Sequence, residues 1–402
     1  MLNISQFIAS SITLRSKSMF AEDIEANKDK LRAEIEDKSV LVIGGAGTIG
    51  SSFIRAVLKF RPSKLFVVDI SENGLTELTR DLRSTADTCV PESYTTYPIN
   101  FADPVFEKIF RNEGGFDIVA NFSAHKHVRS EKDIYSVEAL IKNNVINARK
   151  LLDLLSEFPP GHFFCVSTDK AANPVNIMGA SKKIMEDMIM AYSTKYPITT
   201  ARFANVAFSN GSLLDGFIQR IMKRQPLSAP NDVRRYFVSP DESGQICMLA
   251  CMLGKSGEIY FPKLQPEQML TFAEIATAFL KDLGYNAIEC DSEEAARQMA
   301  KNRSETEINY PVYYFGSDTT GEKAYEEFFT DSEEVDLSEF HALGVIKNAP
   351  KRPMSEIDSL FSSLTQLFQN PSASKSDIVE AMKAFLINFN HEEKGKNLDS
   401  KM

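Results

Sequence analysis

The sequence contains no tryptophan, and only five cysteines and five histidines are present among its 402 residues. The cysteines form no C-x-x-C pair: Cys247 and Cys251 stand at the i, i+4 spacing of a helix within an apolar run, apart from Cys89, Cys165 and Cys290. This usage argues against a disulfide framework. We expect buried free thiols in a reducing compartment.

Long apolar runs and clustered positive charge are also missing. No stretch approaches the roughly 20 apolar residues that a membrane-spanning helix requires, and the N-terminal segment lacks the basic and continuous apolar regions of a secretory signal. The formal net charge of −10 argues against a nucleic-acid surface, although an anionic nucleotide can still bind locally. We therefore expect a cytoplasmic protein with no membrane span and no nucleic-acid partner.

Short β-rich runs alternate with helix-length segments in the first half of the chain. The runs lie at residues 39–43, 64–69, 94–99, 116–122, 162–167 and 198–203. This alternation predicts an α/β fold with a doubly wound parallel sheet covered by helices on both faces. Beyond about residue 205 the alternation fades, which predicts a smaller lobe that closes over the carboxyl ends of the strands.

A glycine-rich segment, VLVIGGAGTIG, includes the first predicted strand and the turn after it. Gly44 permits a tight turn, Gly47 lets the backbone approach a pyrophosphate, and Gly50 lets the next helix pack closely with its N-terminus toward the negative charge. Asp69 ends the second strand, where a carboxylate can bind an adenosine ribose and repel a 2′-phosphate. The order of strand, glycine-rich turn, helix, second strand and acidic residue predicts a dinucleotide site that prefers NAD to NADP. The alternative is a structural turn with a solvated Asp69.

A second segment, STDKAANPVNIMGASK (167–182), completes a resemblance to the extended short-chain dehydrogenase/reductase family. Within that family the chain is most similar to UDP-N-acetylglucosamine 4,6-dehydratases of polysaccharide biosynthesis, in the bacillosamine-pathway-like branch with Met in place of the catalytic Tyr. The resemblance spans about residues 39–265 and includes SAHKHV (123–128) and RFANVAFSNGS (202–212). The chain departs from the family at Asn100-Phe-Ala-Asp103 and at Arg129.

The resemblance implies a Rossmann domain with bound NAD and a UDP-sugar substrate. The expected segments are an N-terminal helical extension with one helix over 21–37, an NAD-binding domain, an interleaved substrate-binding lobe, C-terminal helices and a flexible tail, at residues 1–38, 39–205, 206–350, 351–390 and 391–402. The related enzymes pair through the helices that flank the active-site segment, so we expect a homo-oligomer. Ile184, Met188 and Tyr192 share one helical face there, which could equally pack on the sheet.

The resemblance also implies roles for individual residues. The residues expected to contact the cofactor are Gly44, Gly47, Thr48, Ile49, Gly50, Asp69, Ser123, Ala124 and Lys182. The expected substrate contacts are Lys126, Met178, Asn205, Ser212 and Arg235, and the expected catalytic residues are Thr168, Asp169, Lys170 and Lys182. An exposed, uninvolved arginine is an equally good interpretation of Arg235.

The chemistry of water removal accounts for the Asp-Lys pair. Oxidation of the sugar at C4 by NAD⁺ acidifies the C5 proton, which Lys170 can take if its pKa is lowered, while Asp169 can protonate the departing C6 hydroxyl if its pKa is raised. Met178 cannot accept the C4 hydroxyl proton, so Asp169, Thr168 or a water relay must do so. Without such a role, Asp169 would cap a turn, Lys170 would be a surface residue and Met178 core filler.

Other functions remain open at this point. A 4-epimerase or a dehydratase of another nucleotide sugar would use the same fold, although epimerisation gives the Asp-Lys pair no task, and a non-catalytic NAD-binding scaffold would not need Lys170. No metal site is predicted, because His125 and His127 have no Cys or carboxylate set beside them. SDTTGEK (317–323) lacks the first glycine and final hydroxyl residue of a Walker loop.

Overall fold

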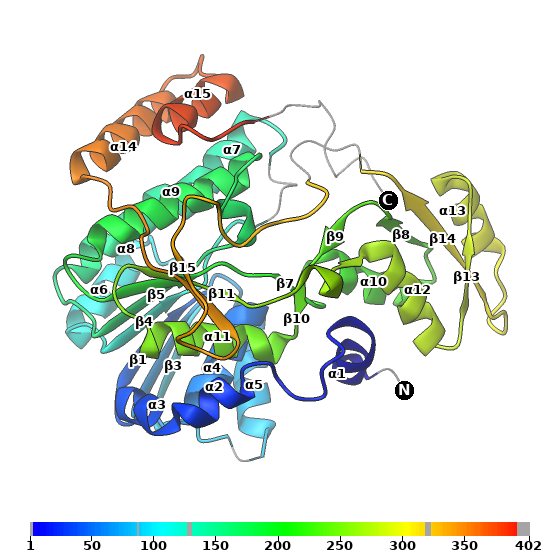
Figure 1. Ribbon diagram of the computed structural model, residues 1–402, viewed down its shortest axis with the longest axis horizontal. Helices are drawn as coiled ribbons and strands as arrows, with labels where there is room; N and C mark the ends of the chain where they lie inside the picture. Colours follow the sequence, from blue (N-terminus) through cyan, green and yellow to red (C-terminus); the bar gives the residue numbers. More distant parts are fainter. Residues whose placement is uncertain (1–2, 87, 127–130, 318–322, 392–402) are drawn as a thin grey trace.

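The computed structural model describes residues 3–86, 88–126, 131–317 and 323–391. These residues form a large sheet with helices on both faces and a smaller lobe beside it (Figure 1). The prediction of a doubly wound α/β fold is confirmed. His127, Arg129, most of SDTTGEK and the tail after residue 391 lie outside the described residues.

The large sheet has the order β15-β16-β11-β6-β5-β4-β1-β2-β3 in the described part of the chain. The strands from β3 to β11 in this order all pair in parallel. Beyond β11, β16 pairs antiparallel with β11, and β15 pairs antiparallel with β16. Their bounds are β1 Ser39–Ile43, β2 Lys64–Val68, β3 Ser93–Tyr97, β4 Ile118–Asn121, β5 His162–Val166, β6 Ile198–Ala201, β11 Glu258–Pro262, β15 Val335–Asp336 and β16 Leu343–Ile346.

The strand order reverses between β1 and β4, and this switch point positions the ligand site. Because β2 and β3 extend the sheet to one side of β1 while β4 and β5 extend it to the other, the loops after β1 and β4 diverge and leave a crevice at the carboxyl ends. The central strands are buried on both faces, as their apolar sequences predict. The motifs at 44–50 and 167–182 both follow carboxyl ends of this sheet.

Helices cover both faces of the sheet (Figure 1). One face carries α3 (Lys28–Ile35), α4 (Thr48–Leu58), α5 (Glu72–Ser84) and α11 (Pro240–Leu253), and the other α6 (Pro104–Glu113), α7 (Ile134–Ile141), α8 (Ala148–Leu155) and α9 (Ile177–Tyr192). The prediction of a single helix over residues 21–37 is wrong. The chain forms α2 (Ala21–Ala26) and α3, because Asn27 leaves helical geometry and donates its side-chain amide to the carbonyl of Asp23.

The smaller lobe has its own apolar core. Its elements are α10 (Leu213–Met222), α12 (Phe272–Asp282), α13 (Glu293–Asn302) and the parallel strands β8 (Leu227–Pro230), β14 (Asn309–Phe315) and β13 (Asn286–Glu289). The N-terminal α1 (Ile4–Phe7) and the π-helical turn at Ile8–Ile12 join this core, where Phe7 packs against Phe208 and Phe279. The chain leaves the large sheet after β6 and returns to it for β11, β15 and β16; the numbered segment boundaries stay a prediction.

Two short pairings connect the lobe to the sheet. Strand β7 (Asn205–Val206) pairs with β10 (Phe237–Val238), and β9 (Arg234–Arg235) pairs with β12 (Leu270–Thr271). These crossings carry Asn205 and Arg235, two of the expected substrate contacts, to the boundary between the lobe and the sheet.

A hairpin of two C-terminal helices, α14 (Met354–Gln369) and α15 (Lys375–Phe385), lies over α8 and α9 (Figure 1). Arg352 Nε lies 3.1 Å from Asp187 Oδ2, and Arg149 Nη1 lies 2.9 Å from Asp358 Oδ1. The face of Ile184, Met188 and Tyr192 is buried within the single chain, so it packs internally, as the alternative interpretation held. None of the helices among the described residues is long and apolar enough to cross a membrane.

A buried ion cluster ties the sheet to α9 and to the segment before β15. Arg202, which is 0% exposed, donates to Glu186 from Nε and Nη2 at 3.0 and 2.6 Å. It also donates to Glu333 and to the carbonyl of Phe328, and Ser167 Oγ donates to Glu186 Oε2. A buried guanidinium requires such complete pairing, because its desolvation is otherwise uncompensated.

Replacing Arg202 by methionine should lower the free energy of unfolding by about 3–5 kcal/mol, because Glu186 and Glu333 lose their shared cation while Glu186 stays fully buried. Urea unfolding of the variant and of wild type measures this difference. Lys28→Met, which removes an exposed pair with Glu25, should change stability by no more than about 0.5 kcal/mol. An Arg202→Met variant as stable as this control would contradict a structural role for the cluster.

The ion cluster also predicts how the free energy of unfolding changes at acid pH. Burial alone would raise the pKa of Glu186, but the charges of Arg202 and Lys183 override it and lower this pKa to about 2. A carboxylate with a lowered folded-state pKa stabilises the protein above its unfolded value of about 4.3 and loses that contribution as the pH falls through the folded value. Unfolding free energies of wild type should therefore fall more steeply than those of Arg202→Met between about pH 5 and 2.

Candidate active site

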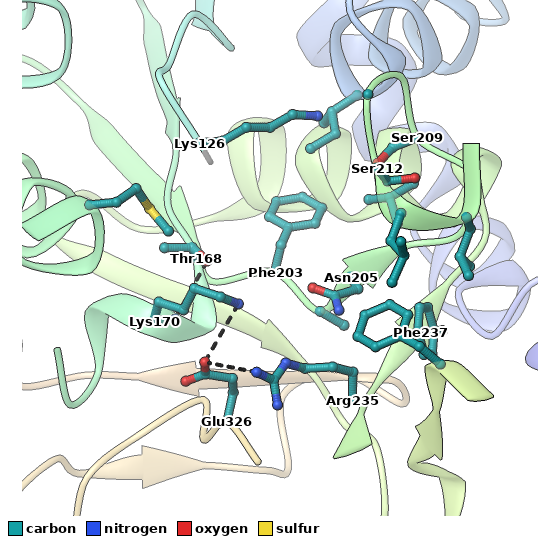
Figure 2. Close-up of a pocket in the computed structure, with 18 of the residues that line it drawn as sticks. Lys126, Thr168, Lys170, Phe203, Asn205, Ser209, Ser212, Arg235, Phe237 and Glu326 are labelled. Carbon is teal, nitrogen blue, oxygen red and sulfur yellow. Dashed lines mark hydrogen bonds and ion pairs between the residues drawn. The ribbon is translucent and has the colours of Figure 1, made fainter. Parts of the chain in front are cut away.

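A cleft of about 620 Å³ opens at the carboxyl ends of β4, β5 and β6, between the large sheet and the lobe. Figure 2 shows Lys170, Glu326 and Arg235 grouped at one end and Lys126 with Ser212 at the other. The expected site residues that line it are Ile49, Ala124, Lys126, Thr168, Lys170, Met178, Lys182, Asn205, Ser212 and Arg235. Asp169 and the remaining expected cofactor contacts, which are Gly44, Gly47, Thr48, Gly50, Asp69 and Ser123, are not among its lining residues.

The glycine-rich turn joins β1 to the N-terminus of α4. Gly44 has a φ of +75°, and a Cβ there would lie 2.7 Å from the backbone nitrogen of Ser123, so only glycine fits between the two loops. A Cβ at Gly47 would approach only the carbonyl oxygen of Gly44, at 3.5 Å. The side of the turn at Gly47 is therefore open to a ligand, beside backbone N–H groups at a helix N-terminus that suit a diphosphate.

Asp69 is fixed beside this turn at the end of β2. Its Oδ2 accepts from the N–H of Ala46 at 3.0 Å, and its Oδ1 accepts from the N–H of Ser71 at 2.9 Å. The interpretation of Asp69 as a merely solvated residue therefore does not hold. A carboxylate has about four acceptor positions, so two remain for ribose hydroxyls. The turn, the helix N-terminus and Asp69 together fit the adenosine diphosphate half of NAD.

Thr168, Asp169 and Lys170 form a turn directly after β5. Asp169 Oδ1 accepts hydrogen bonds from Thr168 Oγ1 at 2.9 Å and from Lys170 Nζ at 3.0 Å. Asp169 is only 3% exposed and lies behind its two donors, which both line the cleft. Asp169 is thus an acceptor held away from the cleft in this geometry, which does not fit the expected direct proton donation to a substrate.

Lys170 is the cation at the centre of the site. Burial alone would lower its pKa, but Asp169 and Glu326 override burial and raise the pKa above the ordinary lysine value. We expected the pKa of Lys170 to be lowered, as a base at rest requires, and for the free protein this expectation is wrong. Lys170 is also not the surface lysine of the alternative interpretation, because its side chain is 18% exposed and paired on two sides.

Glu326, which the sequence interpretation missed, lines the cleft from the segment before β15. Its Oε1 lies 3.7 Å from both Lys170 Nζ and Arg235 Nη2, and burial raises its pKa. Arg235 is 4% exposed and donates to the carbonyls of Lys323 and Ala324, so the interpretation of Arg235 as an exposed residue is wrong. The signal that could have found Glu326 is a pair of glutamates within an aromatic run, YEEFF (325–329).

Lys182 and Met178 lie one turn apart on α9, whose first turn is capped by Asn176 through the N–H of Gly179. Lys182 Nζ donates to the carbonyl of Val166 at 2.7 Å, and burial lowers its pKa although Cys165 and Glu186 oppose the shift. Met178 presents its side chain to the cleft while its N–H donates to Glu131. Lys182 retains donor capacity for a ribose, since an ammonium has three protons.

The opposite end of the cleft is closed by the loop before α10. Asn210 donates its N–H to Thr48 Oγ1 at 2.9 Å and accepts at its carbonyl from Lys126 Nζ at 3.3 Å. Burial lowers the pKa of Lys126, and the nearby Asp215 opposes this shift. Thr48 and Lys126, both expected site residues, thus connect the loops after β1 and β4 to the lobe.

Two further polar groups of the cleft were missed by the sequence interpretation. Arg220 Nε and Ser228 Oγ are buried, and neither has a hydrogen-bond partner in the described part of the chain. Both residues line the cleft, from α10 and β8. Arg220 stands in an apolar helix, a position that gives no functional signal in the sequence.

Among the described residues, no group of three or more His, Cys, Asp or Glu side chains could hold a metal ion. His125 donates its backbone N–H to Asn144 Oδ1 at 2.8 Å, and burial lowers the pKa of its side chain. The other member of the H-x-H pair, His127, lies outside the described residues.

Solved structures resemble this chain in fold. Pen from Bacillus thuringiensis matches with a TM-score of 0.63 at 20% identity, over 79% of this chain and 90% of that one. A dTDP-glucose 4,6-dehydratase from Bacillus anthracis in complex with NAD matches with a TM-score of 0.52 at 16% identity, over 73% and 88%. A UDP-N-acetylglucosamine 4-epimerase from Methanobrevibacter ruminantium, in complex with UDP-N-acetylmuramic acid, matches with a TM-score of 0.53 at 17% identity, over 76% and 96%.

Curated relatives match in sequence. An uncharacterized membrane protein of Methanocaldococcus jannaschii is 31% identical over 319 residues, which are 77% of this chain and 86% of that protein. A UDP-N-acetylglucosamine 4,6-dehydratase (inverting) of Campylobacter jejuni is 24% identical over 283 residues, 68% of this chain and 80% of that enzyme. The capsular polysaccharide biosynthesis protein CapD of Staphylococcus aureus is 28% identical over 243 residues, 60% of this chain but only 40% of that longer protein.

The profile of one protein family matches most of the chain. The matched residues are 40–348, and the family is described as "Polysaccharide biosynthesis protein". The match begins at β1, includes the cleft and ends just after β16. The chain belongs to this polysaccharide biosynthesis protein family.

Proposed function

We propose that this chain is an NAD-dependent UDP-N-acetylglucosamine 4,6-dehydratase, a hydro-lyase that supplies a UDP-4-keto-6-deoxy sugar for surface glycans. The observation that carries the proposal is the group of Thr168, Lys170 and Glu326 at the end of β5, in the same cleft as Lys182. Elimination of water requires groups that remove and deliver protons, and these side chains can exchange protons beside a dinucleotide site. Family membership and the dehydratases among the relatives support the same reaction.

The cofactor in this proposal is NAD. Bound NAD⁺ would accept hydride from C4 of the sugar and return it to C6. The turn at Gly47 and the N-terminus of α4 would hold the diphosphate, Asp69 would accept from the adenosine ribose, and Lys182 would donate to the nicotinamide ribose. Because Lys182 is buried and already anchored at the carbonyl of Val166, it positions the ribose rather than transferring a proton.

Proton handling at C4 and C5 falls to the turn after β5. Thr168 lines the cleft and donates to Asp169, so its hydroxyl can pass the C4 proton to that carboxylate in place of the missing tyrosine. Lys170 is the base for the C5 proton after it has lost its own proton. Asp169 does not contact the sugar in this proposal. It orients Thr168 and Lys170 through its hydrogen bonds and receives the C4 proton from Thr168.

Substrate binding uses the lobe side of the cleft. Asn205, Ser212 and Lys126 line the cleft and supply polar groups, and Arg220 has a buried Nε that can pair with an anion. The diphosphate of a UDP-sugar is such an anion, and a guanidinium suits it. Arg235 is less suited than expected, because its donors are used on carbonyl oxygens and Glu326.

Assembly and location complete the proposal. We propose a homo-oligomer in the cytoplasm, where NAD and nucleotide sugars are supplied. Because the helical face first expected to pair is buried within the single chain, association would use another surface.

A 4-epimerase remains the nearest alternative, since one occurs among the similar structures. Epimerisation needs only hydride transfer at C4 and gives Lys170 and Glu326 no task. A dehydratase of another nucleotide sugar and a non-catalytic NAD-binding scaffold are the remaining alternatives, and the first experiment separates all of them.

Incubation with UDP-N-acetylglucosamine, UDP-glucose, dTDP-glucose and GDP-mannose should yield loss of one water from the first sugar only, measured by mass spectrometry. In D₂O the product should carry deuterium at C5. Lys170→Met should bind the sugar but lower turnover by about 10²- to 10⁴-fold and leave C5 unexchanged, because the base is gone. An isomer of unchanged mass would establish an epimerase, water loss from another sugar would reassign the substrate, and no reaction would favour the scaffold.

Asp69→Ala should weaken NAD binding by about tenfold or more and reduce the preference over NADP, because a charged acceptor for the ribose is lost. Calorimetric titration with both cofactors measures these affinities. Asp81→Ala removes an acid on α5 that pairs with Arg55 at the surface, and it should leave both affinities unchanged. Equal affinities in the Asp69→Ala variant and wild type would take Asp69 out of the cofactor site.

Arg220→Met should weaken binding of UDP by about tenfold, because the diphosphate loses a charge-assisted hydrogen-bond donor. The comparison variant is Arg297→Met on α13, which loses an exposed pair with Glu293 and should bind UDP like wild type. Titration of UDP into both variants with NAD present supplies the affinities. If both variants bind UDP equally well, Arg220 does not contact the diphosphate.

A further inference from the structure

The N-terminal segment packs into the core of the smaller lobe, although it precedes the part of the chain that the family profile matches. Phe7, Ile8 and Ile12, on α1 and the π-helical turn after it, are at most 4% exposed. Arg15 then donates to Glu242 of α11 through hydrogen bonds of 2.8 and 2.7 Å. The segment therefore connects the core of the lobe to a helix of the large sheet (Figure 1).

Phe208 stands in a backbone conformation that phenylalanine rarely adopts. Its φ is +54°, and it is the third residue of a turn in which the N–H of Ser209 donates to the carbonyl of Val206 at 3.2 Å. A positive φ at this position of a turn favours glycine or asparagine. For a phenylalanine the left-handed region is disfavoured by roughly five- to thirtyfold in population. Contacts elsewhere must therefore hold Phe208 in this conformation.

Phe7 provides such a contact. Its ring meets the ring of Phe208 edge to face with the centroids 6.0 Å apart, and it meets Phe279 of α12 edge to face at 5.4 Å. The rings of Phe208 and Phe279 lie 5.5 Å apart, so the three rings form a closed cluster. Such aromatic pairs stabilise a core beyond the area that they bury. Without Phe7, the ring of Phe208 would have room to move and its backbone could relax to a negative φ.

The loop that follows this turn supplies polar groups to the cleft. Ser209 and Ser212 both line the cleft. Asn210, which lies between them in the sequence, donates its N–H to Thr48 and accepts from Lys126. Because the backbone changes direction only through φ and ψ, a change of φ in the turn would move all of these groups relative to the sheet. The conformation of the turn therefore sets where the two hydroxyl groups meet a ligand.

We propose that Phe7 is a positioning residue for the UDP-sugar, an inference that rests on the proposed function and in which Phe7 acts through Phe208. Phe7 is not among the residues that line the cleft. It holds Phe208 in the left-handed conformation, which places the hydroxyl groups of Ser209 and Ser212 for hydrogen bonds to the sugar nucleotide. The turn after β5, which handles protons, belongs to the sheet and keeps its geometry. Phe7 therefore acts on substrate affinity and not on the chemical step.

The first measurement compares affinity with turnover. Phe7→Ala should weaken binding of UDP in the presence of NAD, and raise KM for UDP-N-acetylglucosamine, by about tenfold, with kcat changed by no more than about twofold. Phe7→Leu keeps an apolar side chain against Phe208 and should stay within about threefold of wild type in both affinities. A loss confined to kcat in Phe7→Ala would contradict the proposal.

The decisive variant combines Phe7→Ala with Phe208→Gly. Glycine adopts a positive φ without steric cost, so the turn no longer needs aromatic support, and UDP affinity should return to within about threefold of wild type. The double variant has lost two rings of the core and should unfold at a lower urea concentration than Phe7→Ala. Affinity and stability thus change in opposite directions, which a purely structural role of Phe7 could not produce. A double variant that binds UDP no better than Phe7→Ala would overturn the proposal.

Tyr310→Leu is the matched control for lost stability. Tyr310 belongs to the same core, packs on Tyr285 with the ring centroids 5.2 Å apart, and donates to the carbonyl of Gln225. This variant should unfold more easily than wild type but bind UDP equally well. If its UDP affinity falls as far as that of Phe7→Ala, the effect of Phe7 is a general loss of packing and the proposal is wrong.

Hydrogen exchange separates this inference from the proposed function, because it needs no ligand. The N–H groups of Asn210 and Gly211 donate to Thr48 and Asp215. Both should exchange about fivefold faster or more in Phe7→Ala, and more slowly again in the double variant. If this pattern holds but wild type binds no UDP, the UDP-sugar function fails while the role of Phe7 in holding the loop stands. Unchanged exchange in Phe7→Ala would overturn that role.

Discussion

The pairing of Arg202 is the constraint on which the geometry of the cleft depends. A fully buried guanidinium must find acceptors for its donors, and Arg202 finds them on α9, through Glu186, and on the segment that ends in Glu333. That segment also gives the carbonyl of Phe328, two residues beyond Glu326. The charge at the end of β6 therefore draws a late part of the chain over the sheet and delivers Glu326 to Lys170. Removal of one partner would release both α9 and the wall of the cleft.

The resulting site is built from distant parts of the sequence. Thr168 and Lys182 stand on the rigid strand end and helix of the sheet, which are suited to hold a cofactor in one place. Asn205 and Arg220 belong to the lobe, joined to the sheet by pairings of two residues each.

The sheet and the cofactor end followed from local patterns. Runs of β-rich composition predicted β1 to β6 within one or two residues; in the buried strands the signal is clear because both faces need apolar residues, whereas the edge strand β3 is polar and only half-buried. The roles of Gly44 and Asp69 could be predicted because they depend on the strand and turn to which each residue belongs. The positions of Arg220 and Glu326 in the cleft and the surroundings of Lys170 depend on contacts between residues far apart in the sequence, and YEEFF (325–329) is the one local signal that marks Glu326. The break at Asn27 has a local cause instead, because one side chain bonds to the carbonyl of Asp23 and outweighs the helix propensity of its neighbours.

The hairpin of α14 and α15 has a consequence for how the fold responds to dilution. It covers α8 and α9 with side chains of the same polypeptide, and Lys375 donates to the carbonyl of Glu131, which in turn holds the N–H of Met178. If a second copy of the chain covered this face, the fraction of molecules with the face shielded from water would depend on protein concentration, by mass action. A face covered within one chain stays dry at any concentration. Helix α9, which follows the turn at Thr168–Lys170, is thus kept in register at any protein concentration.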